Sequence, residues 1–134
     1  MAGGRGAVSE VIEARKRVIG AEHRDTLMSM RMLALTYWSQ GRLSEAEKLQ
    51  VEGLETTRRV LGREHPSTLV AMHNLATTYE RQGKLREAEE LMAETVALKK
   101  QVLGESHANT QNSIRYLETI QQRIRAELSS ESAS

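Results

Sequence analysis

The sequence has no cysteine and no phenylalanine, and it has only one proline and one tryptophan among 134 residues. The absence of cysteine excludes disulfides, thiolate zinc sites and cysteine nucleophiles. One proline and nine glycines are few helix breakers for this length, which favours long helices joined by short turns. Nineteen basic residues against eighteen acidic ones give a net charge of +1, so there is no general attraction to nucleic acid or acidic membranes.

Long apolar runs are also missing. The first ten residues, MAGGRGAVSE, lack the apolar segment of a signal peptide. No window approaches the roughly 18 consecutive apolar residues that a membrane-spanning helix needs. We therefore expect a soluble, cytoplasmic protein of about one domain.

The strongest feature of the sequence is an internal repeat. Residues 20–61 and 62–103 align without a gap and are identical at 20 of 42 positions. The same phase continues in "GESH" from Gly104, and residues 13–20 match the end of a repeat. A fixed period of this length is typical of repeat arrays. We expect a half repeat at 8–19, full repeats at 20–61 and 62–103, a terminal helix at 104–128, and disordered tails at 1–7 and 129–134.

The apolar spacing within each repeat is helical. Met72, Leu75, Ala76 and Tyr79 fall at i, i+3, i+4 and i+7, which places them on one face of a helix. Glycine ends each periodic stretch, as at Gly83, which is a natural helix stop. The sequence predicts an all-α protein with helices near 8–19, 24–39, 44–60, 66–81, 86–102 and 108–128.

Small and large residues recur at fixed offsets in the two copies: Leu33, Ala34, Tyr37, Gly41 and Ala46, then Leu75, Ala76, Tyr79, Gly83 and Ala88. This pattern resembles the tetratricopeptide repeat (TPR) signature. With "LGxEHPxT" at the junction and "QGKxxEAEEL" in the middle, the 42-residue form resembles the kinesin light chain type. It is similar to the arrays at the C-terminal ends of fungal NACHT and NB-ARC signalling proteins. The resemblance implies an antiparallel helix-hairpin solenoid, about six helices in a right-handed superhelix.

Two sets of side chains could suggest chemistry, and both are better explained by structure. His23, His65 and His107 recur at one repeat position. Stacked helices lie ~8–10 Å apart, whereas zinc needs its ligands at ~2 Å, so these histidines cannot share one ion. The carboxylates of "SEAE" and "EAEE" lie early in their helices, where they complement the helix dipole. We expect no metal, no cofactor and no enzymatic activity.

The family resemblance implies that the first helix of each hairpin lines a concave, peptide-binding groove. Asn74 matches the asparagine with which kinesin light chain relatives hold a peptide backbone, and Met32 and Tyr116 replace it in the other copies. The repeat-related residues Arg31, His73 and Arg115 would form a ladder of donors. The expected groove residues are Arg31, Met32, Leu35, Trp38, His73, Asn74, Thr77, Arg81, Arg115, Tyr116, Thr119 and Arg123.

Cationic groove positions outnumber Glu80, which favours an extended acidic peptide or a partner protein carrying one. The arginines could equally be solvated surface, and both interpretations stay open. Met28, Met32, Leu35 and Trp38 form an apolar cluster in one copy only, which favours packing against another repeat over a ligand pocket. The alternative function is therefore structural assembly, with self-association through the ends of the array, including a homodimer.

Overall fold

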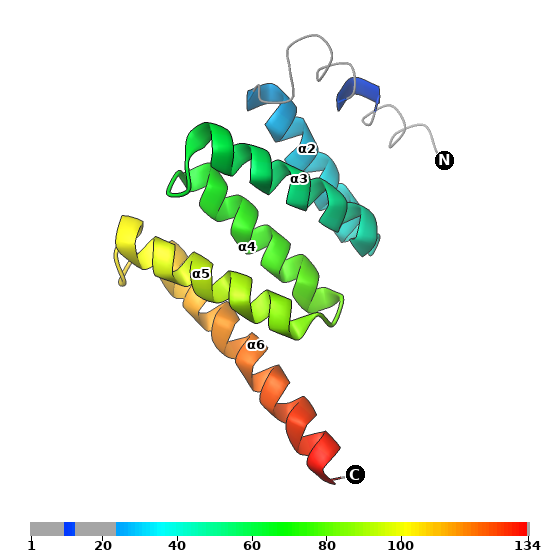
Figure 1. Ribbon diagram of the computed structural model, residues 1–134, viewed down its shortest axis with the longest axis vertical. Coiled ribbons are helices and arrows are strands. Elements are labelled where there is room, and N and C mark those ends of the chain that lie inside the picture. Colours follow the sequence, from blue (N-terminus) through cyan, green and yellow to red (C-terminus); the bar gives the residue numbers. More distant parts are fainter. Residues whose placement is uncertain (1–9, 13–23, 134) are drawn as a thin grey trace. The chain divides into compact units, whose positions relative to one another are not determined.

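The structure is a computed structural model that describes residues 10–12 and 24–133. Every regular element in these residues is helical: α2 (Arg24–Ser39), α3 (Leu43–Leu61), α4 (Pro66–Arg81), α5 (Leu85–Leu103) and α6 (Ala108–Ala133) (Figure 1). Residues 10–12 are helical as well. The all-α prediction is confirmed, while the first expected helix, 8–19, lies largely outside the described residues.

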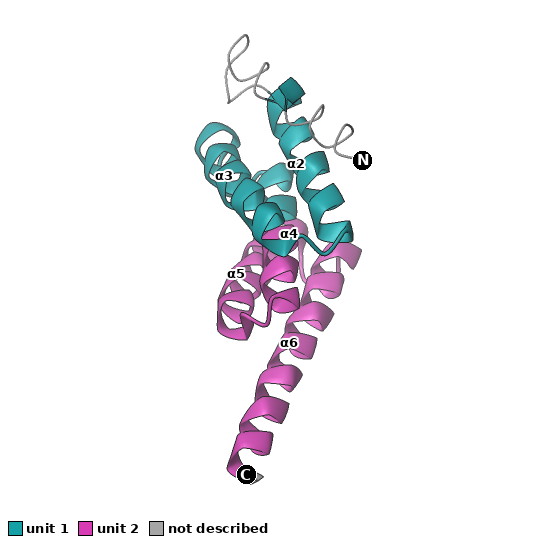
Figure 2. Cartoon of the chain, turned by 90° about the vertical axis from the view of Figure 1, so that its right-hand side faces the viewer, with its two compact units in different colours: residues 1–71 teal, residues 72–134 magenta. Residues whose placement is uncertain are grey.

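The chain divides into two compact units, Met1–Ala71 and Met72–Ser134, coloured separately in Figure 2. Helix α4 begins in unit 1 and ends in unit 2. The handedness of the superhelix depends on how the two units are placed relative to each other, so the right-handed superhelix stays a prediction.

In unit 1, α2 and α3 form an antiparallel hairpin. Gly41 allows the reversal because its φ of 77° lies in the left-handed region that residues with a Cβ rarely adopt. The Arg42 N–H donates to the Tyr37 carbonyl at 2.8 Å, which closes the end of α2. The apolar cluster contains Ile12, Met30 and Leu33, with Leu27, Tyr37 and Leu49 packed against it.

Unit 2 repeats this hairpin chemistry. Gly83 has a φ of 80°, and the Lys84 N–H donates to the Tyr79 carbonyl at 2.9 Å. The second half of α4 then packs with α5 and α6 around one core, which contains Ala76, Leu85, Ala88, Met92, Ile120 and Ile124. The buried alanines are those that recur in the sequence, and their small side chains let the helix backbones approach closely.

The junction histidines have a role that the repeat pattern did not reveal. The His65 Nδ1 accepts a hydrogen bond from the Ser67 N–H at 3.0 Å, and the His107 Nδ1 accepts one from the Asn109 N–H at 3.1 Å. Each histidine therefore caps the first turn of the helix that follows it, α4 or α6, by satisfying an N–H that has no partner within the helix.

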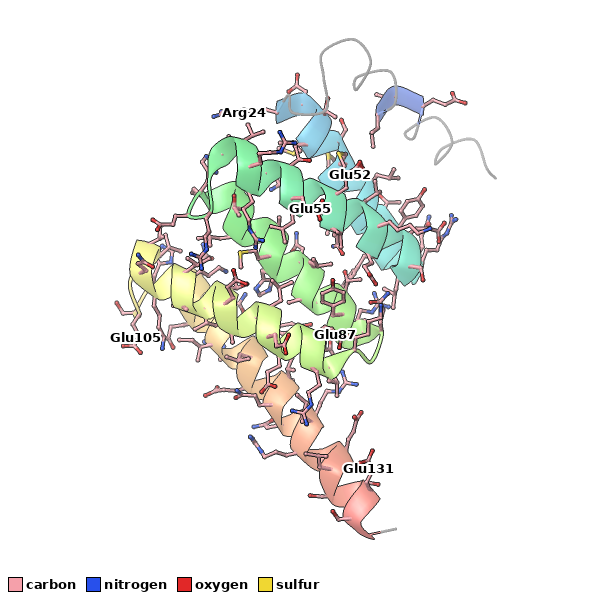
Figure 3. The ribbon with its side chains drawn as sticks, in the orientation of Figure 1. Arg24, Glu52, Glu55, Glu87, Glu105 and Glu131 are labelled. Atoms are coloured by element: carbon pink, nitrogen blue, oxygen red, sulfur yellow. The ribbon has the colours of Figure 1, made fainter. Side chains whose placement is uncertain are left out.

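The carboxylates of the repeat motif lie where the sequence placed them. Glu45 and Glu87 are in the first turns of α3 and α5, where a negative charge complements the helix dipole. Glu87 is exposed, and Figure 3 labels its side chain. Glu45 is half-buried and forms an ion pair with Arg42.

The C-terminal end of the chain differs from the expectation. Helix α6 has 26 residues, against 19 in α5, and it continues to Ala133 where a disordered tail from residue 129 is expected from the sequence. No glycine or proline interrupts residues 129–133, so nothing in the local sequence ends the helix. The last turns of α6 run beyond the N-terminal end of α5 (Figure 1). Leu128, in this last part of α6, is 49% exposed.

Candidate functional site

The second half of α4 and the middle of α6 are joined by polar and aromatic contacts. His73 lies edge-on to the Tyr116 ring, with ring centroids 5.5 Å apart. Further along both helices, the Tyr116 hydroxyl donates to Glu80 Oε1 at 3.0 Å, and Arg123 forms an ion pair with Glu80. We call the surface around these contacts the α4–α6 face; it comprises His73, Asn74, Thr77, Glu80 and Arg81 of α4 with Arg115, Tyr116, Thr119 and Arg123 of α6.

A buried polar chain supports this face from beneath. The Lys99 side chain of α5 is buried, and its Nζ donates to the Ser113 Oγ at 2.8 Å. The same Nζ lies 3.5 Å from the Asn109 carbonyl oxygen. Ser113, fully buried on α6, is in turn hydrogen-bonded to the His73 Nδ1 at 3.0 Å. The buried Lys99 ammonium is thus compensated by hydrogen bonds. A buried charge needs such bonds because it has lost its contacts with water.

Burial and, to a lesser degree, the nearby Lys99 ammonium lower the pKa of His73 from 6.5 to about 4. Burial also lowers the pKa of Lys99 from its ordinary value. Burial raises the pKa of the Tyr116 phenol, an effect that the nearby Arg81 partly opposes. At neutral pH His73 is therefore an uncharged member of the α4–α6 face.

This result changes the charge expected at the predicted site. Of the five cationic residues expected at the site, Arg31 lies on α2 in unit 1. His73 is neutral at pH 7, and Arg123 forms an ion pair with Glu80. The other two, Arg81 and Arg115, are exposed. The local excess of positive charge is consequently smaller than the sequence suggested.

The polar side chains of this face differ in how far they are already hydrogen-bonded. The hydroxyls of Thr77 and Thr119 donate to backbone carbonyls of their own helices, at 2.7 and 3.1 Å. The Asn74 carboxamide is half-buried and has no hydrogen-bond partner in the described part of the chain. The Arg115 guanidinium is exposed and likewise has no hydrogen-bond or ion-pair partner among the described residues. Asn74 and Arg115 are thus available to a partner.

The site residues expected on α2 lie in unit 1. Met28, Met32 and Leu35 are 49%, 61% and 43% exposed and follow one side of the helix. The Trp38 side chain is half-buried. Arg31 is also half-buried, and its Nη2 lies 3.4 Å from the Met28 Sδ. We call Met28, Met32 and Leu35 the α2 stripe.

The structure therefore brings together the predicted residues of α4 and α6 in unit 2, and those of α2 in unit 1. A single groove joining the two sets stays a prediction. Sequence reasoning missed Lys99 and Ser113. Lys99 stands where the first copy has Thr57, and Ser113 stands where the second copy has Ala71 and the first has Ser29, so the repeat pattern does not single these two residues out.

Residues 10–12 and 24–133 contain no group of three histidine, cysteine or acidic side chains that is placed to hold one metal ion. None of the helices described there combines the length and the apolar character needed to cross a membrane.

The family model for the tetratricopeptide repeat matches residues 26–67 and 68–109, two adjacent stretches of 42 residues. The chain belongs to the tetratricopeptide repeat family. Its array is similar to one of the kinesin light chain type, as the first of the two structures compared below supports. Tetratricopeptide repeats are a protein-interaction fold, so the chain is a protein-interaction or scaffold module and not an enzyme.

Among solved structures, the chain is similar to nearly identical TPR-like repeats from a Podosopora anserina protein described as a kinesin light chain. The TM-score is 0.80 at 29% identity, over 88% of this chain and 56% of that one. This chain thus spans little more than half of that structure. A point variant of those repeats matches with a TM-score of 0.70 at 24% identity, over 97% of this chain and 68% of that one, which supports the fold alone. No curated protein matches the sequence. The link to fungal NACHT and NB-ARC arrays stays a prediction.

Proposed function

We propose that the protein binds an extended, acidic segment of a partner protein, and that the α4–α6 face is part of the binding surface. The observation that carries the proposal is the pair of available groups on this face. Asn74 offers a carboxamide that can bond a peptide backbone, and Arg115 offers a guanidinium without a carboxylate in the described residues. Arg81 adds a second exposed positive charge. In the tetratricopeptide family, inner positions of the first helix of each hairpin carry such contacts.

Magnitudes limit the affinity that this face can provide. An exposed ion pair contributes ~0–1 kcal/mol, because water and salt screen it. A shielded charge-assisted hydrogen bond contributes ~1.5–3 kcal/mol. Two exposed arginines and one carboxamide are therefore consistent with micromolar binding that weakens as salt is raised.

The proposal predicts a preference for negative charge in a peptide series. The probes are acetylated and amidated decapeptides in which alanine alternates with glutamate, glutamine or lysine. We expect binding in the order glutamate, glutamine, lysine at low salt, and we expect the Arg81→Glu, Arg115→Glu double variant to bind the glutamate peptide about 5- to 30-fold more weakly. Fluorescence anisotropy with labelled peptides measures both effects.

The matched control is the Lys48→Glu, Arg125→Glu double variant, which makes the same charge change at exposed sites outside the α4–α6 face. It should leave the affinity within about twofold, apart from the long-range effect of net charge. Equal loss in the two double variants would mean that overall charge, rather than this face, determines binding. Equal binding of all three parent peptides would contradict the proposal.

A second candidate function is self-association through the α2 stripe, with a second copy of this chain as the occupant. Exposed apolar side chains that follow one side of a helix are a common feature of interfaces. The stripe has apolar groups of similar size along its length, so an identical stripe can oppose it in a two-fold dimer.

Self-association predicts a mass that rises with concentration. We expect light scattering to show dimer at high micromolar concentration and a monomer for Met32→Glu, which places a charge in the centre of the stripe. The control Val70→Glu introduces the same charge at an exposed apolar residue on α4 and should leave the dimer intact. A parent mass that stays monomeric at all concentrations would rule out this function.

A further inference from the structure

The buried polar chain determines where the proton of His73 lies. The Lys99 ammonium has only donors, so the Ser113 Oγ must accept its hydrogen bond. Ser113 has one hydroxyl proton, and its remaining hydrogen bond is with the His73 Nδ1. In this arrangement the hydroxyl donates to Nδ1, which must be unprotonated. The proton of the neutral ring is therefore on Nε2.

The opposite arrangement leaves a buried hydroxyl proton without an acceptor. If Nδ1 carried a proton and donated to Ser113, the serine oxygen would accept from both His73 and Lys99, and its own proton would have no acceptor among the described residues. If the His73 ring were charged, two cations would share one buried network in a medium of low dielectric constant. The titratable and charged groups around His73 are Lys99 from α5, Tyr116 from α6, and Glu80 on α4, which Tyr116 contacts. A single charge on Lys99 satisfies all of the observed bonds.

The Nε2 side of the ring faces away from this network. In the described part of the chain Nε2 has no hydrogen-bond partner, and it is not among the buried polar atoms that lack one. Part of its surface therefore reaches solvent, while the His73 ring as a whole lies edge-on to the Tyr116 ring. The ring contact and the Ser113 bond hold its orientation from two sides.

We propose that His73 is a specificity residue of the α4–α6 face: a neutral donor with a fixed tautomer, whose Nε2–H bonds a backbone carbonyl of the bound segment. Lys99 and Ser113 are its positioning residues. This inference rests on the proposed function. It adds that His73, one of the three repeat-related donors, recognises the peptide backbone instead of an acidic side chain. A neutral N–H is suited to a neutral carbonyl, whereas arginine gains most from a carboxylate.

The chain itself supplies the variants for a test. The first copy has Thr57 where the second has Lys99, and the second copy has Ala71 where the following stretch has Ser113. Ser113→Ala and Lys99→Thr therefore introduce residues that the same repeat position already accommodates. Circular dichroism establishes that each variant remains folded before it is compared.

The tautomer can be measured without any ligand. A long-range proton–nitrogen correlation spectrum of the ¹⁵N-labelled chain at pH 7, with His73 assigned through His73→Gln, should show an unprotonated Nδ1 and a protonated Nε2. Ser113→Ala should convert this signal to a mixture of tautomers. A proton on Nδ1, or a mixture of tautomers in the parent protein, would overturn the inference.

The binding role is tested separately with the glutamate–alanine decapeptide. His73→Gln places a neutral N–H donor near the position of Nε2 and should bind within about twofold of the parent, while His73→Met removes the donor and should bind about 2- to 10-fold more weakly. Equal affinity of these two variants would overturn the specificity role. If the parent binds no decapeptide, the proposed function fails and the specificity role fails with it, while the spectrum still decides the tautomer.

Discussion

Replacing Ile120 with alanine should lower the free energy of unfolding by about 2–5 kcal/mol, the range for removing a large aliphatic side chain from a packed core. Ile120 is 0% exposed and lies on α6 within the core of unit 2. It packs there with residues of both α4 and α5, including Ala76 and Met92. The change leaves a cavity where three helices meet, so the loss should exceed the transfer free energy of the missing groups. Urea denaturation followed by circular dichroism measures it.

The matched control is Leu128→Ala on the same helix. Leu128 is 49% exposed, so its truncation should change the free energy of unfolding by no more than about 0.5 kcal/mol. If the two variants are destabilised equally, the end of α6 is packed in a way that the structure does not show.

Lowering the pH from about 6.5 to 4 should destabilise the protein through His73, by ~2–3 kcal/mol after allowance for partial exposure. In the folded protein the pKa of His73 is about 4, whereas an unfolded chain has the ordinary value of 6.5. Between these values the unfolded chain binds the proton and the folded protein does not. The stability is fully present above pH 6.5 and falls as the pH falls toward 4.

The variant His73→Gln isolates this contribution, because glutamine does not titrate. Urea midpoints of the parent and of His73→Gln should be recorded at half-unit steps from pH 7.5 to 4.5. We expect the difference between the two curves to shrink, or to change sign, as the pH falls. Parallel curves would show that the pKa of His73 in the folded protein equals that in the unfolded chain. They would contradict the buried position of His73 near Lys99.

The helical elements could be predicted because the determinants are local and duplicated. The expected helices at 24–39 and 66–81 coincide with α2 and α4. Those expected at 44–60 and 86–102 differ from α3 and α5 by one residue at each end. Gly41 and Gly83, both of positive φ, follow the ends of α2 and α4, and an apolar stripe at helical spacing defines the buried side of each helix. The exception is the end of α6, where polar residues without a breaker were interpreted as a disordered tail.

The candidate site was less predictable, because its chemistry depends on contacts between helices. The family resemblance predicts that His73, Asn74 and Arg115 line the groove side of their helices, but it could not show that Lys99 of α5 reaches Ser113 beneath them. Nor could it show that Glu80 is shared between Tyr116 and Arg123. These contacts decide which side chains are charged, which are already hydrogen-bonded, and which remain for a partner.

The most direct measurement of the central claim is to map where an acidic peptide binds. Backbone amide shifts of the ¹⁵N-labelled protein should be followed while the glutamate–alanine decapeptide is added at low salt, with the lysine–alanine peptide as control. The account predicts saturable shifts centred on Asn74, Arg81, Arg115 and Thr119, and much smaller shifts at Ala93 and Ala97, which are exposed on α5. Shifts centred on α5, or equal shifts with the lysine peptide, would contradict it.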